Sequence, residues 1–296
     1  MKKLLISSLF WLSPTVVLAD PLQVLASFSI VGNLVQEIGG ERVNVTTLVG
    51  ADQDAHVYQP APQDVKKLNR ASVFVVNGLG FEGWVSRLAK SSGFKGKTVI
   101  ASAGIAPQNN PAGQGEHGHS GQDPHAWHNP QNVKVYVRNI AAALTQADPS
   151  GKDYYAQRLT RYAQQLDEAD TFARAQFERI PRARRQVVTS HEAFAYLAQH
   201  YQIRFIAPQG ISTDAEASAK GVAQLVRQVR HEKIKAVFVE NMTDSRLVAQ
   251  LSREAGVTVG GKLYADALSA PGTAADTYLK FFRYNVDRKS TRLNSS

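Results

Sequence analysis

Residues 153–180 form the longest periodic segment of this sequence, and no other stretch limits the fold as much. Charged residues take one side of the segment and apolar residues recur on the other at intervals of three and four, which predicts a single amphipathic helix. At 1.5 Å per residue, such a helix is about 40 Å long. Pro181 ends the pattern, and the middle of the chain contains no loop-like linker. We therefore predict that this helix connects two lobes. Its apolar positions are Tyr155, Leu159, Tyr162, Leu166, Ala169, Ala173 and Phe177.

Short apolar strands and amphipathic helices alternate on both sides of this segment. Short links join them, which is typical of βα units stacked on a parallel sheet. The sequence therefore predicts an α/β fold in which two βα lobes with mainly parallel sheets are joined by one long connecting α-helix. The predicted strands are residues 23–26, 43–49, 72–77, 98–101, 186–190, 203–207, 236–240 and 257–259. The other predicted helices are residues 30–38, 62–68, 81–90, 130–147, 193–201, 215–232, 245–255 and 273–286.

The pattern divides the chain into five parts. We expect a signal peptide at 1–19, an N-terminal lobe at 20–150, the connecting helix at 151–181, a C-terminal lobe at 182–287 and a tail at 288–296. The tail is polar and has no apolar period, so we expect it to be frayed or non-native and leave it out of the predicted fold.

The first 19 residues have the three-part build of a secretory signal peptide. Two lysines, Lys2 and Lys3, precede an interrupted apolar run that ends in Val-Leu-Ala before Asp20. The alternative, a membrane anchor, fits less well because the apolar run is short for a hydrocarbon layer of about 30 Å. The 296 residues include no cysteine, so lipid attachment after cleavage and disulfides are both excluded. We expect an exported chain in the periplasm that is not lipid-anchored.

The formal net charge of +9 raises the question of nucleic-acid binding. Five of the positive charges lie in the expected leader and tail, and removing them from +9 leaves +4 for the rest of the chain. The remaining basic residues are spread along helix faces and interleaved with acidic ones. A nucleic-acid interface requires a clustered basic stripe, so we expect no nucleic-acid partner.

A rigid histidine-bearing loop lies at residues 122–130. His125 and His128 fall between Pro124 and Pro130, and proline restricts the backbone on both sides. His117 and His119 lie just upstream, so that four of the eight histidines fall within twelve residues. Neutral imidazole is the commonest metal ligand among side chains, and such a loop suits Zn²⁺. For His117 and His119 we expect solvated loop positions, with weak metal capture as the alternative; His128 could be exposed or support a ligand.

Three histidines and one aspartate fall on loops that follow predicted strands, two in each half of the chain. They are His56, His125, His191 and Asp266, and facing lobes would bring them to one cleft. Three imidazoles and one carboxylate complete a tetrahedral Zn²⁺ shell. From the residues alone, simpler readings stay open: a solvated His56, a helix-capping His191 and an ordinary turn at Asp266. His200 and His231 lie at helix ends, and we assign them no role.

Six motifs give the chain a resemblance to the zinc/manganese solute-binding family of ABC transporters. Residues 54–58 and 123–127 read Asp-Ala-His-Val-Tyr and Asp-Pro-His-Ala-Trp. In the second half, residues 190–197, 208–218, 238–241 and 263–269 also match. The resemblance covers nearly the whole expected mature chain. It implies two βα lobes on one long helix, and it implies the ligands His56, His125, His191 and Asp266.

The third ligand position distinguishes members of this family. Those that resemble manganese binders tend to carry glutamate there, whereas this chain has His191, and a third nitrogen favours Zn²⁺ over the harder Mn²⁺. Manganese or another divalent ion remains an alternative. One departure is His128 followed by Asn129, where many members have an apolar residue and then aspartate.

The expected function is capture of a metal ion without turnover. The resemblance implies a monomer that hands the ion to a membrane permease driven by a cytoplasmic ATPase. We expect no catalytic residue, because four protein ligands leave no open position for an activated water. A periplasmic zinc chaperone or adhesin on the same fold is the alternative. A zinc hydrolase, with Asp266 as a base, is a further one.

Overall fold

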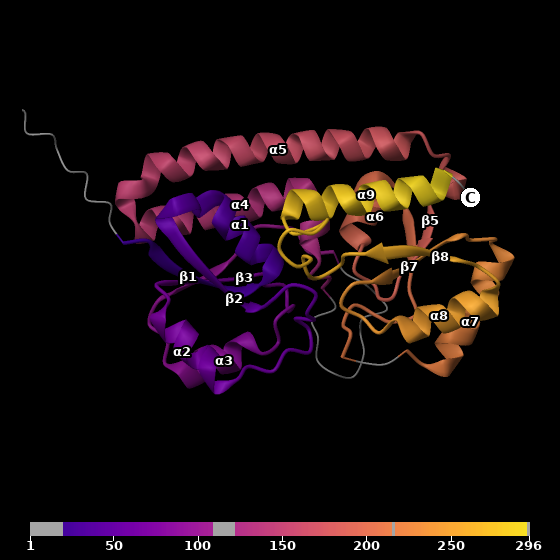
Figure 1. Ribbon diagram of the computed structural model, residues 1–296, viewed down its shortest axis with the longest axis horizontal. Coiled ribbons are helices and arrows are strands. Elements are labelled where there is room, and N and C mark those ends of the chain that lie inside the picture. The colour runs from indigo at the N-terminus through magenta and orange to yellow at the C-terminus, as the bar shows by residue number, and fades with distance from the viewer. Residues whose placement is uncertain (1–19, 109–121, 215–216, 295–296) are drawn as a thin grey trace, which may run out of the picture.

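The computed structural model describes residues 20–108, 122–214 and 217–294. Within these ranges the chain forms two α/β lobes that lie side by side beneath a long helix, as Figure 1 shows. Each lobe contains a four-stranded sheet, and every strand pairing in both sheets is parallel. The predicted fold class is therefore confirmed.

The two sheets have the same strand order, β2-β1-β3-β4 in the N-terminal lobe and β6-β5-β7-β8 in the C-terminal lobe. The N-terminal strands are β1 (Leu22–Phe28), β2 (Val43–Val49), β3 (Val73–Val76) and β4 (Lys97–Ile100). Its helices are α1 (Ser29–Gly39), α2 (Pro62–Arg70), α3 (Val85–Ser92) and α4 (Pro130–Ala147). The C-terminal strands are β5 (Gln186–Val188), β6 (Arg204–Ile206), β7 (Ala236–Glu240) and β8 (Val259–Leu263). Its helices are α6 (Ala195–Tyr201), α7 (Ala219–His231), α8 (Ser245–Ala255) and α9 (Tyr278–Asn294).

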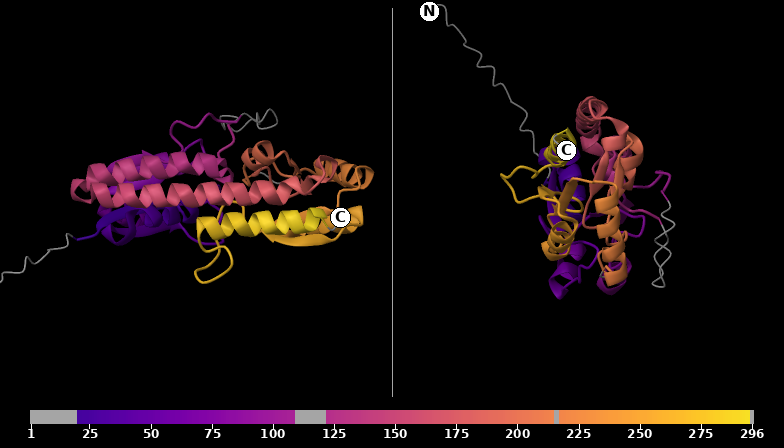
Figure 2. Two further views of the ribbon diagram at one scale, coloured as in Figure 1. Left: turned by 90° about the horizontal axis from the view of Figure 1, so that it is seen from above. Right: turned by 90° about the vertical axis from the view of Figure 1, so that its right-hand side faces the viewer.

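The connecting helix is α5 (Lys152–Glu178), which has 27 residues and spans both lobes. Seen from above, it runs between α4 and α9, with which it makes contact (Figure 2). Its buried Asp170 accepts hydrogen bonds from Tyr201 at 2.6 Å and from His200 at 2.8 Å, which fastens α5 to α6. At the other end, Arg158 of α5 donates to the carbonyl of Glu37 in α1 at 2.7 Å. Polar contacts therefore hold the connector to both lobes.

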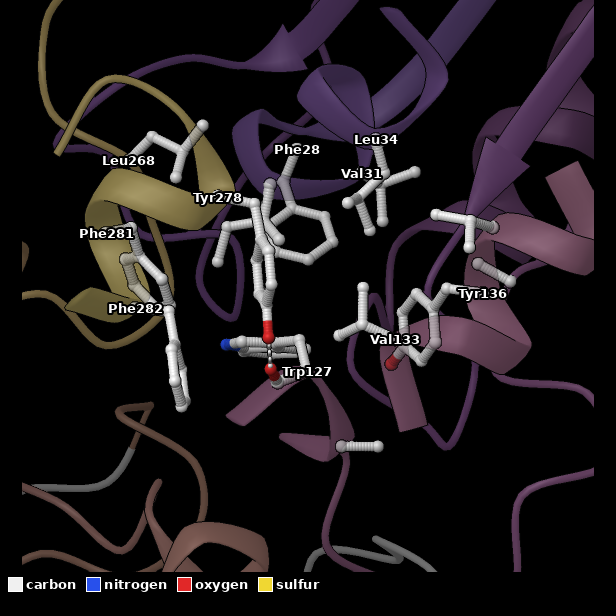
Figure 3. Close-up of a cluster of buried hydrophobic side chains, with 14 of the residues drawn as sticks. Phe28, Val31, Leu34, Trp127, Val133, Tyr136, Leu268, Tyr278, Phe281 and Phe282 are labelled. Carbon is white, nitrogen blue, oxygen red and sulfur yellow. Dashed lines mark hydrogen bonds between the residues drawn. The ribbon is translucent and has the colours of Figure 1, made fainter. Parts of the chain in front are cut away.

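The two lobes share one continuous hydrophobic core. Its centre is shown in Figure 3, where the hydroxyl of Tyr278 donates to the carbonyl of Trp127 at 2.8 Å. The indole N–H of Trp127 donates to the carbonyl of Ala265 at 3.0 Å, and Phe28 packs against the indole with ring centroids 5.2 Å apart. A smaller apolar cluster lies beneath α7 and α8. Separating the lobes would expose the shared core to water, which is unfavourable in proportion to its apolar area.

The expectation that residues 288–296 stand outside the fold is wrong for residues 288–294, which form the last turns of α9. Val286 and Leu293 are buried on the side that packs on the core. Lys289 is also buried, and its ammonium lies 3.8 Å from the centre of the Phe194 ring. Arg184 donates to the carbonyls of Leu293 and Asn294 and so satisfies the end of the helix. This packing is tertiary and leaves no apolar period in the sequence.

Several helices begin later than the periodicity predicts, because local hydrogen bonds decide where a helix starts. Helix α7 begins after Ser218, whose hydroxyl accepts the N–H of Gly221 at 3.1 Å. Before α9, the Thr273 hydroxyl bonds the Ser269 hydroxyl at 2.6 Å and holds a turn in place of the predicted helix start. None of the described helices combines the length and apolar character of a membrane span. The predicted signal peptide, His117 and His119 lie outside the described residues.

Candidate metal centre

The structure brings His56, His125, His191 and Asp266 together at the junction of the lobes. One potential ligand atom from each lies within 4.8 Å of all the others. The Nε2 atom of His191 is 3.1 Å from Asp266 Oδ2, and Nε2 of His56 is 3.3 Å from the same oxygen. The Nε2 atom of His125 is 3.5 Å from Oδ1 of Asp266 and 3.3 Å from Nε2 of His56. Four side chains from four separate loops thus converge on one point.

Each of these loops follows a strand of a parallel sheet. His56 comes after β2 and His125 after β4, while His191 comes after β5 and Asp266 after β8. The carboxyl ends of parallel strands form one edge of a sheet, and loops at that edge are where α/β proteins place ligands. Because each lobe turns this edge toward the other, each contributes two of the four side chains.

Carboxylates orient two of the imidazole rings. The Nδ1 atom of His125 lies 2.7 Å from Oδ1 of Asp123, and Nδ1 of His191 is hydrogen-bonded to Oε2 of Glu240. A carboxylate can only accept a hydrogen bond, so Nδ1 carries the proton in each ring and donates it. The Nε2 atoms of both rings are then free to present a lone pair to a cation, an arrangement typical of metal-bound histidine.

Sequence reasoning assigned no role to Asp54, Asp123 or Glu240, although all three support the cluster. A local signal exists for the first two, because Asp54 and Asp123 each come two residues before a predicted ligand. Their Oδ1 atoms accept the backbone N–H of His56 at 2.9 Å and of His125 at 2.8 Å. Such turns are characteristic of aspartate. For Glu240 the signal is weaker: it is a carboxylate at the end of a buried apolar strand.

The cluster contains buried polar atoms that require a partner. His191 Nε2 and both carboxylate oxygens of Asp266 make no hydrogen bond of acceptable geometry to any described residue. Both side chains are fully buried, and the His56 side chain is 4% exposed. Buried polar atoms in proteins are normally paired, and a cation among these atoms would satisfy them. The residues present therefore fit a divalent metal ion with nitrogen and oxygen ligands.

The surroundings lower the pKa of His56 and of Asp266 and raise the pKa of His191. Burial lowers the pKa of His56 and favours its neutral form. Burial also acts to lower the pKa of His191, but the carboxylates of Glu240 and Asp266 outweigh it and raise that pKa well above its usual value. For Asp266, burial acts to raise the pKa, while His191 and His125 hold it well below its ordinary value. The raised pKa of His191 means that Nε2 also binds a proton in the metal-free protein, and an ion must displace that second proton, so binding weakens as the pH falls.

Aromatic side chains cover the cluster on the side of the N-terminal lobe. The ring of Phe81 packs edge-on against His56, with centroids 4.6 Å apart, and Trp127 packs against His125 at 5.2 Å. The indole N–H of Trp84 donates to the carbonyl of Ala55, the residue before His56, at 2.9 Å. This apolar wall lowers the local dielectric and strengthens electrostatic attraction inside the site.

His128 lies apart from the cluster and is fully buried, so the expectation that it could be exposed is wrong. Its ring packs against Phe194, with centroids 4.4 Å apart, and stacks on Phe281 at 5.6 Å. Neither ring nitrogen has a hydrogen-bond partner among the described residues, and burial lowers its pKa well below the usual value. His128 is therefore a neutral packing residue. His200, for which the sequence predicts no role, pairs with Asp170 and fastens α5.

Comparison with known proteins identifies the family. The sequence profile of the periplasmic zinc-uptake complex component A family (ZnuA) matches residues 24–290. The chain belongs to this family. It is the substrate-binding component of a metal ABC transporter, which works with a membrane permease and its ATPase, and it is not an enzyme.

Relatives of known name cover almost the whole chain. The manganese ABC transporter substrate-binding lipoprotein PsaA of Streptococcus pneumoniae is 29% identical over 281 residues, which cover 93% of this chain and 90% of that protein. The manganese-binding lipoprotein MntA of Halalkalibacterium halodurans is 31% identical over 268 residues, covering 90% and 87%. Both relatives are named lipoproteins, which conflicts with the expectation of an unanchored chain. That expectation rests on the absence of cysteine from the 296 residues of this chain.

Solved structures share the fold and are described as binding different metals. The periplasmic zinc binding protein TroA from Treponema pallidum has a TM-score of 0.85 and 27% identity, covering 93% of this chain and 99% of TroA. The manganese-bound periplasmic metal binding protein from Candidatus Liberibacter asiaticus has a TM-score of 0.81 and 30% identity, covering 92% and 99%. Divalent metal binding is thus common to the group, whereas the metal differs among its members.

Proposed function

We propose that this protein captures Zn²⁺ in the periplasm through His56, His125, His191 and Asp266 and delivers it to the permease. The observation that carries the proposal is the convergence of three imidazoles and one carboxylate within 4.8 Å, in a buried site. Zn²⁺ favours four such nitrogen and oxygen ligands in a tetrahedron. With the shell filled by protein, no position is left for a reactive water, which suits a carrier.

The preference for zinc over manganese is supported by the third histidine. His191 supplies a nitrogen that its bond to Glu240 leaves available. Imidazole suits Zn²⁺, whereas Mn²⁺ prefers oxygen ligands. The names of the relatives divide between the two metals: PsaA and MntA are named for manganese, and TroA is described as zinc binding. The ligand set of this chain is therefore the better guide to its metal.

For location, we propose a monomer that is free in the periplasm. Residues 1–19 have the pattern of a cleaved signal peptide, and the family description is periplasmic. Lipoproteins are acylated on a cysteine thiol, and the 296 residues include no cysteine. Fractionation of cells that express the full chain tests this directly: the protein should be recovered in the periplasmic fraction without detergent extraction of the membranes.

The metal assignment is tested by native mass spectrometry with metal analysis after equal supply of zinc and manganese. We expect the wild type to take one Zn²⁺ and the His191→Glu variant to shift toward Mn²⁺. His231→Glu is the matched control, because His231 lies at the end of α7, away from the cluster, and its replacement should leave metal choice unchanged. If the wild type takes manganese in preference to zinc, the zinc assignment is wrong.

A further inference from the structure

Near the metal centre, side chains reach from one lobe to the other at partly exposed positions. Asp54 lies on the N-terminal loop that carries His56. Its Oδ1 atom accepts the backbone N–H of His56 at 2.9 Å, and its Oδ2 atom accepts the hydroxyl of Thr213 at 2.6 Å. Thr213 belongs to the C-terminal lobe, in the loop after β6. One carboxylate therefore links the backbone of a proposed ligand to the opposite lobe.

A second bridge starts from Asn241, which follows Glu240 at the end of β7. Its Nδ2 atom donates to Oδ1 of Asp52 in the other lobe at 2.8 Å and to the carbonyl of Ala267 at 3.3 Å. Its Oδ1 atom accepts the N–H of Ala265 at 3.3 Å. The side-chain amide of Asn241 is thus hydrogen-bonded both to the two residues that flank Asp266 and to the opposite lobe.

The backbone at Asp52 shows that this contact is held firmly. Asp52 has a φ of 54°, a left-handed conformation that residues other than glycine seldom adopt. Its N–H donates to the carbonyl of Leu268 at 2.9 Å, across the junction, while its side chain accepts from Asn241. Such backbone geometry persists where surrounding contacts enforce it.

We propose that the pairs Asp54–Thr213 and Asp52–Asn241 form an interlobe clasp that holds His56 and Asp266 in place and sets the rate at which the bound ion leaves. The inference rests on the proposed function. The shared core and α5 oppose separation of the lobes, so the loops bearing the ligands are the parts free to open. The Asp54–Thr213 bond is partly buried and the Asp52–Asn241 bond is exposed, so water can compete for both, unlike the buried bonds of Trp127 and Tyr278.

The first test compares three variants of similar size. Thr213→Val removes the hydroxyl with little change of shape, and Thr213→Ser keeps it. The matched control is Thr243→Val, because the Thr243 hydroxyl bonds Ser190 at 3.0 Å within one lobe. Release of the ion into excess chelator is followed by stopped flow, with zinc, or with manganese if the wild type binds that ion. A hydrogen bond to a charged group is worth enough that Thr213→Val should release the ion about tenfold faster.

A second readout does not need the ion. In metal-free protein, Thr213→Val should speed amide hydrogen exchange in residues 50–58, while Thr213→Ser and Thr243→Val should both stay within about twofold of the wild type. The proposal is overturned if Thr213→Val leaves release unchanged, or if Thr243→Val accelerates it equally. A wild type that binds no metal would defeat the proposed function instead, and unchanged exchange in Thr213→Val would then separately defeat the clasp.

The second pair is tested by exchanging its partners. Asn241→Asp keeps the acceptor for Ala265 but sets two carboxylates against each other, so ion release should accelerate by about tenfold or more. The double variant Asn241→Asp with Asp52→Asn restores a donor and an acceptor in reversed places but not the bond to the carbonyl of Ala267, so release should return part of the way to the wild-type rate. If the double variant is as fast as Asn241→Asp alone, the Asp52–Asn241 contact does not control release.

Discussion

Glu240 holds both the backbone and the ring of His191. Its Oε1 atom accepts the N–H groups of Ser190 at 2.9 Å and of His191 at 3.2 Å, and its Oε2 atom is bonded to Nδ1 of the imidazole. His191 follows β5, and Glu240 is the last residue of the neighbouring parallel strand β7, so that the pairing of the two strands brings these residues together. A residue in the middle of one sheet thereby determines which nitrogen of a proposed ligand faces the ion.

Replacement of Glu240 should therefore weaken metal binding without removing a ligand. In Glu240→Gln, the amide group cannot accept from Nδ1 and from both N–H groups at once, so the ring loses its fixed orientation. Loss of such a supporting partner typically lowers metal affinity by about 10- to 100-fold. Competition titration against a chelator measures it. Glu254→Gln, at an exposed position on α8, is the control; equal affinity in both variants would contradict this role.

Removal of the ion should lower the stability of the whole protein. An ion at about 100 times its Kd adds about 2.7 kcal/mol to the free energy of unfolding. With an unfolding entropy of about 2.1 cal/mol/K per residue, a chain of this size should have a Tm about 5 °C higher with the ion than in chelator. Calorimetry with and without metal measures the difference. Asp266→Asn should lose most of the gain, because its amide is a poorer ligand than a carboxylate. A wild type with the same Tm in both conditions would contradict binding to the folded state.

Acid should destabilise the metal-free protein in part through Asp170. Burial acts to raise the pKa of this carboxyl, but hydrogen bonds from His200 and Tyr201 hold it below its usual range. The pKa of Asp170 is lower in the folded protein than in the unfolded chain, where it is about 4. The carboxylate therefore stabilises the folded protein at a pH above the unfolded pKa, and this contribution is lost as the pH falls toward the folded pKa. Urea unfolding between pH 3 and pH 7, in chelator, measures the loss.

The Asp170→Asn variant should be less stable than the wild type at pH 7 and should lose less stability between pH 5 and pH 3. Asp153→Asn, at an exposed position of the same helix, is the control and should follow the wild type. An acid slope for Asp170→Asn as steep as that of the wild type would show that the carboxyl does not contribute.

The overall shape should change little when the ion binds. Helix α5 contacts both lobes, and the core around Trp127 and Tyr278 crosses the junction without a break. Closure of the kind seen in loop-hinged binding proteins would disturb this packing. Small-angle scattering profiles of metal-free and metal-loaded protein should therefore nearly coincide. A large compaction on binding would show that the connector bends.

The sequence by itself determined the features that depend on local pattern. The period of residues 153–180 predicted α5, and the alternation of strands and helices predicted two parallel-sheet lobes, because side-chain periodicity reflects the geometry of each element. The loops after the strands marked His56, His125, His191 and Asp266, which the structure brings together. Their role as ligands remains part of the proposal.

Only the tertiary structure decided which distant residues support them. Glu240 is 49 positions from His191, and Thr213 is 159 positions from Asp54, so no local period records either contact. The burial of Leu293 and Lys289 at the end of α9 also depends on side chains far away in the chain. Hydrogen bonds and packing of this kind form between elements only after folding has placed them side by side, which is why a reading of neighbouring residues does not contain them.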